Sequence, residues 1–299
     1  SNTTASNNTA VGYQSQEATT TGANNSSLGL HTLRLNTTGA NNTAVGYSSL
    51  GANTTGSYNT ALGRDALELN TTGHSNASVG VGALSTNTTG SANVTVGMNS
   101  LKLNTTGSYN TSIGEGALLA NTTANDNTAV GQTAMRFNTT GTSNTAVGRN
   151  ALYANTTGSR NTTIGMQSGD GITTGIANVI IGFDTGSYQT VLTTGSQNVL
   201  IGAYNKTESV ASTFAMGLGY NLICTSGYTT LGNNVHDIRA QHGVATWATV
   251  SDQRYKKDIA DSTAGLSFIN ALQPRTWNYR TLGELPETFN AYEADSTEV

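Results

Sequence analysis

The residue types most able to do chemistry stand close together near the end of the chain. Ser251, Asp252, Arg254, Lys256 and Lys257 fall within seven positions, after 250 residues that hold only two lysines. A serine hydroxyl becomes a nucleophile when a neighbouring base accepts its proton, and a lysine can serve when burial or nearby cations lower its pKa. Serine followed by aspartate also suits a helix N-cap with a solvated basic face. From residue types alone, both interpretations stay open.

The composition of the chain argues against several classes of function. The 299 residues carry a net charge of −4, which gives no electrostatic case for nucleic acid or membrane binding. No apolar run approaches the roughly 18–20 residues of a membrane-spanning helix. The single cysteine excludes a disulfide framework and a Cys-rich zinc site. We therefore expect no nucleic-acid partner, no membrane insertion, no cofactor and no metal.

A repeat of 17 residues organises the first two-thirds of the chain. Glycines recur at this interval from Gly12 to Gly182, and Gly202 follows after 20 residues. An aliphatic residue precedes each glycine, and an asparagine stands four positions before it. A second apolar position, usually leucine, is followed by a turn that mostly reads Asn-Thr-Thr-Gly. One unit reads N-T-A-V-G-x-x-A-L-x-x-N-T-T-G-x-x.

This repeat predicts an all-β fold, a parallel β-solenoid (β-roll) of 17-residue repeats over residues 1–202. Alternation along a strand places Thr43 and Val45 on one face and Ala44 on the other. We expect the aliphatic residue and the leucine to form a narrow core, and the Asn-Thr-Thr-Gly turns to use positive φ. The small residues on the other strand face would let a neighbouring chain approach closely. The thin core predicts association, most simply as a parallel homotrimer.

The N-T-A-V-G units resemble the N-S-V-A-I-G repeats in the head domains of trimeric autotransporter adhesins. Those domains form left-handed parallel β-rolls packed as trimers, and similar repeats occur in phage tail fibres. The resemblance covers roughly residues 5–235 and implies the same architecture.

Residues 203–250 loosen the pattern. Gly217 and Gly232 stand in similar surroundings 15 residues apart and predict altered terminal coils, followed by a connecting segment from His236. His236 and His242 have metal-binding side chains, but their spacing without a further ligand favours solvated or interface histidines. Cys224 lacks an activating neighbour in sequence and is predicted to be a small buried residue.

Other repeated or scattered polar residues have two interpretations each. The Asn-x-Thr sequons from Asn36 to Asn155 suit a glycan-coated rod, but without a signal peptide we favour asparagines that simply make the turn. The repeated threonines fall in predicted turns, which disfavours an ice-binding face. The carboxylates share no repeat position, so a solvated rim is favoured over a glycosidase pair, and no enzyme acting on an external substrate is predicted.

Residues 251–299 predict a small α/β C-terminal segment. Ser262 is a candidate helix N-cap, and an apolar stripe at Leu266, Ile269 and Leu272 precedes Pro274. The following stretch R-T-W-N-Y-R-T-L indicates a strand.

S-D-Q-R-Y-K-K-D-I followed by L-S-F-I-N-A-L-Q-P-R-T-W-N-Y-R resembles the start of the self-cleaving intramolecular chaperone domain of phage tailspikes, tail fibres and endosialidases. On this resemblance, residues 251–299 are a partial domain of that kind, which trimerises a fibre during folding and then cuts itself off. The resemblance implies that Ser251 is the nucleophile, Lys256 its general base, and Val250–Ser251 the scissile bond.

These patterns and resemblances together predict a phage tail fibre located in the virion, outside the cell. It would be a trimeric shaft that binds a host cell-surface glycan or protein receptor, and it would join other tail proteins through a region before Ser1. A cell-surface adhesin or extracellular filament subunit is the first alternative. A polysaccharide-depolymerising spike is the second.

Overall fold

The computed structural model describes residues 4–244 and 248–249 as strands and turns, with no helix. Accordingly, these residues include no helical segment able to cross a membrane. One three-residue strand recurs in each of the first eleven coils. They are β1 Thr9–Val11, β2 Ser26–Leu28, β3 Thr43–Val45, β4 Thr60–Leu62, β5 Ala77–Val79, β6 Val94–Val96, β7 Thr111–Ile113, β8 Thr128–Val130, β9 Thr145–Val147, β10 Thr162–Ile164 and β11 Val179–Ile181. The remaining strands are β12 Val199–Ala203, β13 Lys206–Thr207, β14 Met216–Tyr220, β15 Ile223–Cys224, β16 Tyr228–Asn233, β17 His236–Gln241 and β18 Ala248–Thr249.

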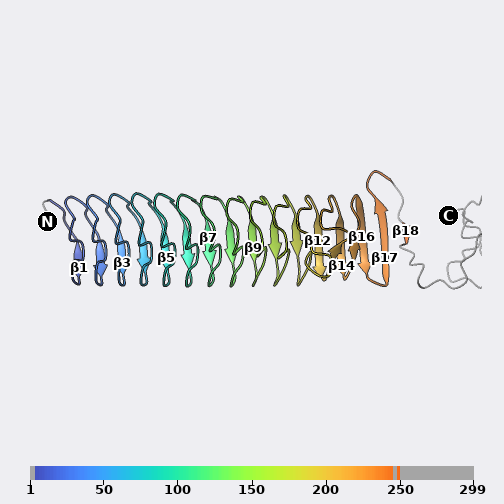
Figure 1. Ribbon diagram of the computed structural model, residues 1–299, viewed down its shortest axis with the longest axis horizontal. Coiled ribbons are helices and arrows are strands. Elements are labelled where there is room, and N and C mark those ends of the chain that lie inside the picture. Colours follow the sequence, from blue (N-terminus) through green and yellow to red (C-terminus); the bar gives the residue numbers. More distant parts are fainter. Residues whose placement is uncertain (1–3, 245–247, 250–299) are drawn as a thin grey trace, which may run out of the picture. The chain divides into compact units, whose positions relative to one another are not determined.

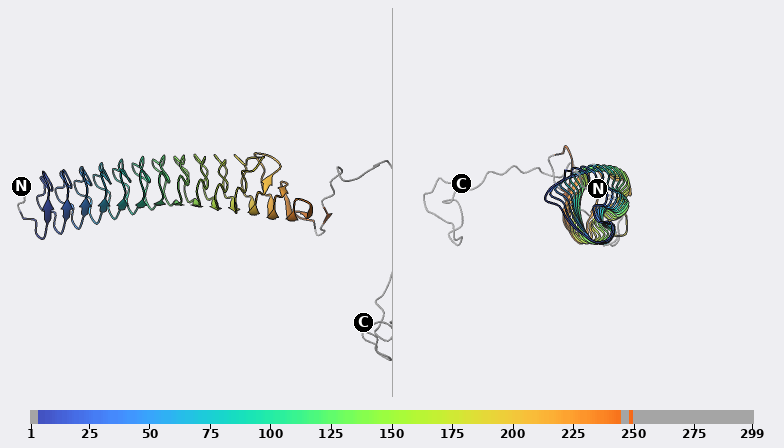
Figure 2. Two further views of the ribbon diagram at one scale, coloured as in Figure 1. Left: turned by 90° about the horizontal axis from the view of Figure 1, so that it is seen from below. Right: turned by 90° about the vertical axis from the view of Figure 1, so that its left-hand side faces the viewer.

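The strands stack into one long sheet in which each coil pairs with the next. β1 to β12 pair in sequence order, and β14 and β16 continue the parallel stack (Figure 1). β13 and β15 form a small second sheet. Equivalent residues face each other, as Val45 faces Leu62. Viewed along the stack, successive coils superimpose (Figure 2). The predicted all-β parallel solenoid is confirmed.

From β2 to β11, the core contains the middle residue of each strand, which corrects the predicted orientation. Ala44 and Leu50 are fully buried, whereas Val45 is half-buried and the equivalent Val96 and Ile113 are 41% and 38% exposed. The aliphatic residue expected in the core therefore lies outside, and the small residue expected to face another chain lies inside. The reason is space, because the leucine and two rows of buried asparagines already fill most of each coil.

The interior of the rod stays filled with side chains where the repeat sequence changes. Gly186 takes the position that Leu152 holds two coils earlier, and a Cβ added there would lie 3.3 Å from Ile180. Ile180 in turn occupies the inner strand position that Ala146 holds two coils earlier. A large side chain is thus moved from one wall of the coil to the other, as close packing requires.

Two rows of asparagine side chains link the coils. In the first row, from the Asn-Thr-Thr-Gly turns, Asn53 Nδ2 donates to Asn36 Oδ1 at 2.8 Å and to the Gly56 carbonyl oxygen at 2.9 Å. In the second row, Asn59 Oδ1 accepts a hydrogen bond from the backbone N–H of Asn76 at 3.0 Å. Identical side chains one coil apart therefore satisfy one another inside the rod.

Positive φ occurs elsewhere than in the predicted turns. The Asn-Thr-Thr-Gly turns between Asn36 and Gly158 contain no residue with positive φ, and it is Leu50 that adopts a φ of 51°. The equivalent leucines share this left-handed conformation, which suits glycine best and is held here by burial of the side chain. The predicted bend at the repeated glycine is confirmed, since a Cβ on Gly46 would lie 2.6 Å from the Gly63 carbonyl oxygen.

The last coils continue the parallel stack, but the glycine at the repeated position is not the one that was predicted. Gly219, rather than Gly217, pairs with Gly202 and with Gly232. Gly217 lies on the inner face against the Cys224 side chain. The predicted connecting segment contains β17, which pairs antiparallel with β16 and so ends the parallel stack.

Candidate functional site

The residues predicted to cut the chain lie outside the described part of the structure. This applies to Ser251, Lys256 and the bond after Val250, and to the small α/β segment predicted to follow. The chain divides between Val250 and Ser251 into two units. The surfaces whose geometry is known belong to the solenoid.

The most extended of these surfaces is the outward face of the long sheet. The residue before the repeated glycine presents an aliphatic side chain there, and register pairing aligns these side chains into a column. Those between 38% and 53% exposed are Val11, Leu28, Leu62, Val79, Val96, Ile113, Ile164 and Leu218. We call this set the aliphatic column. A continuous apolar surface of this kind on a soluble protein usually marks an interaction site.

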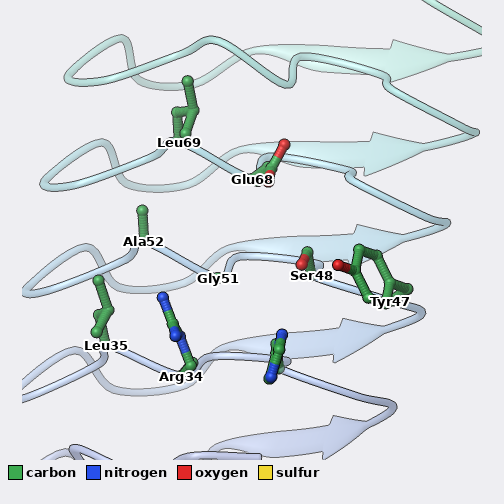
Figure 3. Close-up of a pocket in the computed structure, with 9 residues that line it drawn as sticks. Arg34, Leu35, Tyr47, Ser48, Gly51, Ala52, Glu68 and Leu69 are labelled. Carbon is green, nitrogen blue, oxygen red and sulfur yellow. The ribbon is translucent and has the colours of Figure 1, made fainter.

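A shallow hollow of about 270 Å³ crosses three coils on the N-terminal half of the rod (Figure 3). Arg34, Gly51 and Glu68 occupy the same position in successive coils, so the hollow is the gap left by the missing side chain of Gly51. Burial, and then the charge of Asp65, raise the pKa of Glu68. Asp65 is itself paired with Arg64 at 3.3 Å. The hollow offers one carboxylate and one guanidinium two coil spacings apart, about 10 Å, and this arrangement lacks the carboxylate pair of a glycosidase.

The histidines and the cysteine are separated from one another. His236 and His242 lie at and just beyond opposite ends of β17, about 20 Å apart along an extended strand, too far to share one ion within a chain. Among residues 4–244, no three His, Cys, Asp or Glu side chains gather as metal ligands would. Cys224 is buried, and desolvation raises its pKa to about 12. The prediction of a small buried cysteine is confirmed.

The asparagines that begin the Asn-Thr-Thr turns are closed to modification in the folded rod. From Asn36 to Asn155 these turn asparagines are fully buried, and their Nδ2 atoms donate hydrogen bonds inside the rod, as Asn87 does to Asn70 at 2.8 Å. Glycan attachment needs an accessible Nδ2 atom. The structure therefore favours the structural interpretation of these residues.

Sequence reasoning missed a group of aromatic rings near the C-terminal end of the stack. Tyr188, Tyr204 and Tyr220 are spaced 16 residues apart, and their rings lie side by side in successive coils. The regular interval of 16 was visible in the sequence, but it differs from the repeat of 17 and includes a residue of the enlarged 20-residue coil.

Comparison with known families identifies the segment after the solenoid. Residues 251–296 match the family model described as chaperone of endosialidase, beginning at Ser251. No curated protein and no solved structure matches the chain. A parallel β-solenoid followed by this segment fits a fibre protein of the tail-fibre or endosialidase type.

Proposed function

We propose that this chain is the shaft of a homotrimeric phage tail fibre, carried on the virion, that attaches the particle to its host. The segment beginning at Ser251 assists assembly of the trimer and then releases itself by cleavage of the Val250–Ser251 bond. Ser251 acts as the nucleophile and Lys256 as its base. The family match to the chaperone of endosialidase supports the assembly role.

The observation that carries the proposal is the aliphatic column. It begins at Val11 and recurs as far as Leu218, so a partner that covers it must itself be long and repetitive. Parallel copies of the same chain meet this requirement, because each coil presents the same side chains at the same height. Packing three columns around a common axis removes them from water and thickens the core. Attachment then gains from several identical sites on one particle.

The oligomeric state tests this proposal directly. Val96→Glu with Ile113→Glu places charges in the aliphatic column, and Thr89→Glu with Thr106→Glu places the same charges on exposed turn positions as a matched control. We expect a mass of three chains for the wild type and the control, and loss of the trimer in the column variant. Sedimentation and circular dichroism measure mass and folding together. A wild type that sediments as a folded monomer would contradict the proposal.

A further inference from the structure

The C-terminal coils of the solenoid carry a concentration of aromatic rings. Tyr188 and Tyr204 have ring centroids 5.2 Å apart, and Tyr204 and Tyr220 are separated by 5.8 Å. Phe183 packs against Tyr204 at 5.2 Å, so three rings surround Tyr204. Neighbouring rings meet at 66° to 87°, and this edge-to-face packing holds them rigidly. Tyr220, at the end of the series, remains 55% exposed.

These rings border a groove. Tyr188, Tyr204, Tyr220 and Asn221 line a hollow of about 230 Å³. A second hollow of about 380 Å³ shares Tyr220 and Asn221 and continues along residues 233–236. We call the two together the tyrosine groove. Its size and its mixture of aromatic rings with a few polar groups are those of a small-molecule or oligomer site.

One polar atom in the groove lacks a partner. Asn221 Oδ1 is buried and has no hydrogen-bond partner within the described protein. A buried acceptor of this kind normally binds a donor. Because Asn221 lines both hollows, a hydroxyl group in the groove can supply the missing hydrogen bond once the Asn221 amide turns toward it.

The electrostatics of the groove favour a ligand with many hydroxyl groups and apolar C–H faces. No carboxylate is among the described residues that line either hollow. Lys206 Nζ lies 5.4 Å from the centroid of the Tyr188 ring and also donates to Gln189, so it orders that ring. Asn233, Asn234 and the tyrosine hydroxyls add donors and acceptors at the rim.

We propose that the tyrosine groove binds a saccharide chain running along the rod. Sugar rings offer C–H faces that stack on aromatic rings and hydroxyls that bond to amides. A pyranose ring is comparable in length to the spacing of successive coils, about 4.8 Å. Successive sugars can therefore meet Tyr188, Tyr204 and Tyr220 in turn. This inference rests on the proposed attachment function and assigns it a ligand class and a place.

The test compares groove tyrosines with matched tyrosines elsewhere on the rod. Tyr220→Ala and Tyr204→Ala alter the groove, while Tyr58→Ala and Tyr109→Ala remove side chains that are 66% and 67% exposed outside it. Binding of the assembled protein is measured on immobilised bacterial O-polysaccharides, capsular polysaccharides and their short oligosaccharides. We expect saccharide binding that weakens about tenfold or more in the groove variants, the loss typical of removing a buried interface tyrosine, and no change in the controls.

Folding and assembly are followed by circular dichroism and sedimentation. Since Tyr220 is the more exposed of the two groove residues, its variant keeps the test valid if Tyr204→Ala disturbs the coil. Equal saccharide binding by Tyr220→Ala and wild type, or no saccharide binding by the wild type, overturns the proposal that the tyrosine groove binds saccharide. So does loss of the trimer in Tyr220→Ala, which would show that a second copy occupies this surface. A wild-type trimer that still adheres to bacteria without binding saccharide would leave the attachment function standing.

Discussion

Replacing Asn87 with alanine removes one member of the first asparagine row. Its Nδ2 atom donates to Asn70 Oδ1 at 2.8 Å and to the Gly90 carbonyl oxygen at 2.9 Å. Its Oδ1 atom accepts from Asn104 Nδ2 at 2.8 Å. All three hydrogen bonds are buried, and each contributes about 1 kcal/mol net. We expect Asn87→Ala to lower the free energy of unfolding by about 3 kcal/mol.

Asn155 is a control of the same residue type at the end of the same row. Ile172 occupies the next position, so Asn155 Oδ1 is buried without a partner. Its Nδ2 atom donates to Asn138 Oδ1 at 2.7 Å and to the Gly158 carbonyl oxygen at 3.0 Å. Asn155→Ala loses two hydrogen bonds but also removes an unsatisfied acceptor, so we expect a cost of only about 1 kcal/mol.

Urea denaturation and hydrogen exchange measure these differences together. In a solenoid each coil contacts only its neighbours, so exchange of residues 84–107 should accelerate in Asn87→Ala while distant coils are unaffected. A loss of about 3 kcal/mol corresponds to acceleration on the order of 100-fold. Asn125→Ala, which removes one exposed hydrogen bond from the Ser108 backbone N–H, sets the baseline. An equal loss in Asn87→Ala and Asn155→Ala would refute the reasoning, because only one of them interrupts a continuous row.

Three further predictions concern the core, the cysteine and the cleavage. Gly186→Leu overpacks its coil and Ile180→Ala empties the same coil, each costing about 2 kcal/mol or more, but the double variant restores the leucine and alanine of a regular coil and should cost less than their sum in thermal denaturation. Because burial raises the pKa of Cys224 to about 12 from 9.0, the unfolded chain loses the proton first, and stability should fall as pH rises from 9 toward 12 in urea titrations; the same fall in Cys224→Ala would contradict this. Mass spectrometry of the full-length gene product should find a break after Val250 in the wild type and none in Ser251→Ala, and an intact wild type would exclude self-cleavage.

The sequence predicts the period of the solenoid and the positions of its strands, but not which strand face is inside. Alternation establishes that Thr43 and Val45 share a face opposite Ala44. Which of the two faces points into the core depends on the space that Leu50 and the asparagine rows leave inside the coil. That space is defined only once the coil has folded. The sequence alone therefore predicts the larger aliphatic residue in the core, whereas the interior of a regular coil accommodates only the smaller one.

The functional residues are predictable to differing degrees for similar reasons. The roles of Ser251 and Lys256 stay a prediction, which a local motif suffices to make, and the family match spans both residues. The tyrosine groove depends on three coils of unequal length, so no window of one repeat reveals it. The asparagines of each row recur in the sequence at a constant interval of 17, but their residue type alone indicates only that they form turns. Stacking of the coils is what brings Asn53 within hydrogen-bonding distance of Asn36.

In the proposed trimer, the sameness of the coils creates a need for an assembly device at the C-terminal end of the shaft. If neighbouring copies slip by one coil, the aliphatic column meets itself again, with valine, leucine or isoleucine exchanged for one another at little cost. The features that change the length of a coil or the direction of a strand are the 20-residue coil and the antiparallel β16–β17 pair, both after Asn178. Register between copies must therefore be established from that end. The segment matching the chaperone of endosialidase follows directly, from Ser251. A device that aligns the chains there, and is dispensable once the aliphatic columns have packed, supplies the register that the repeats themselves lack.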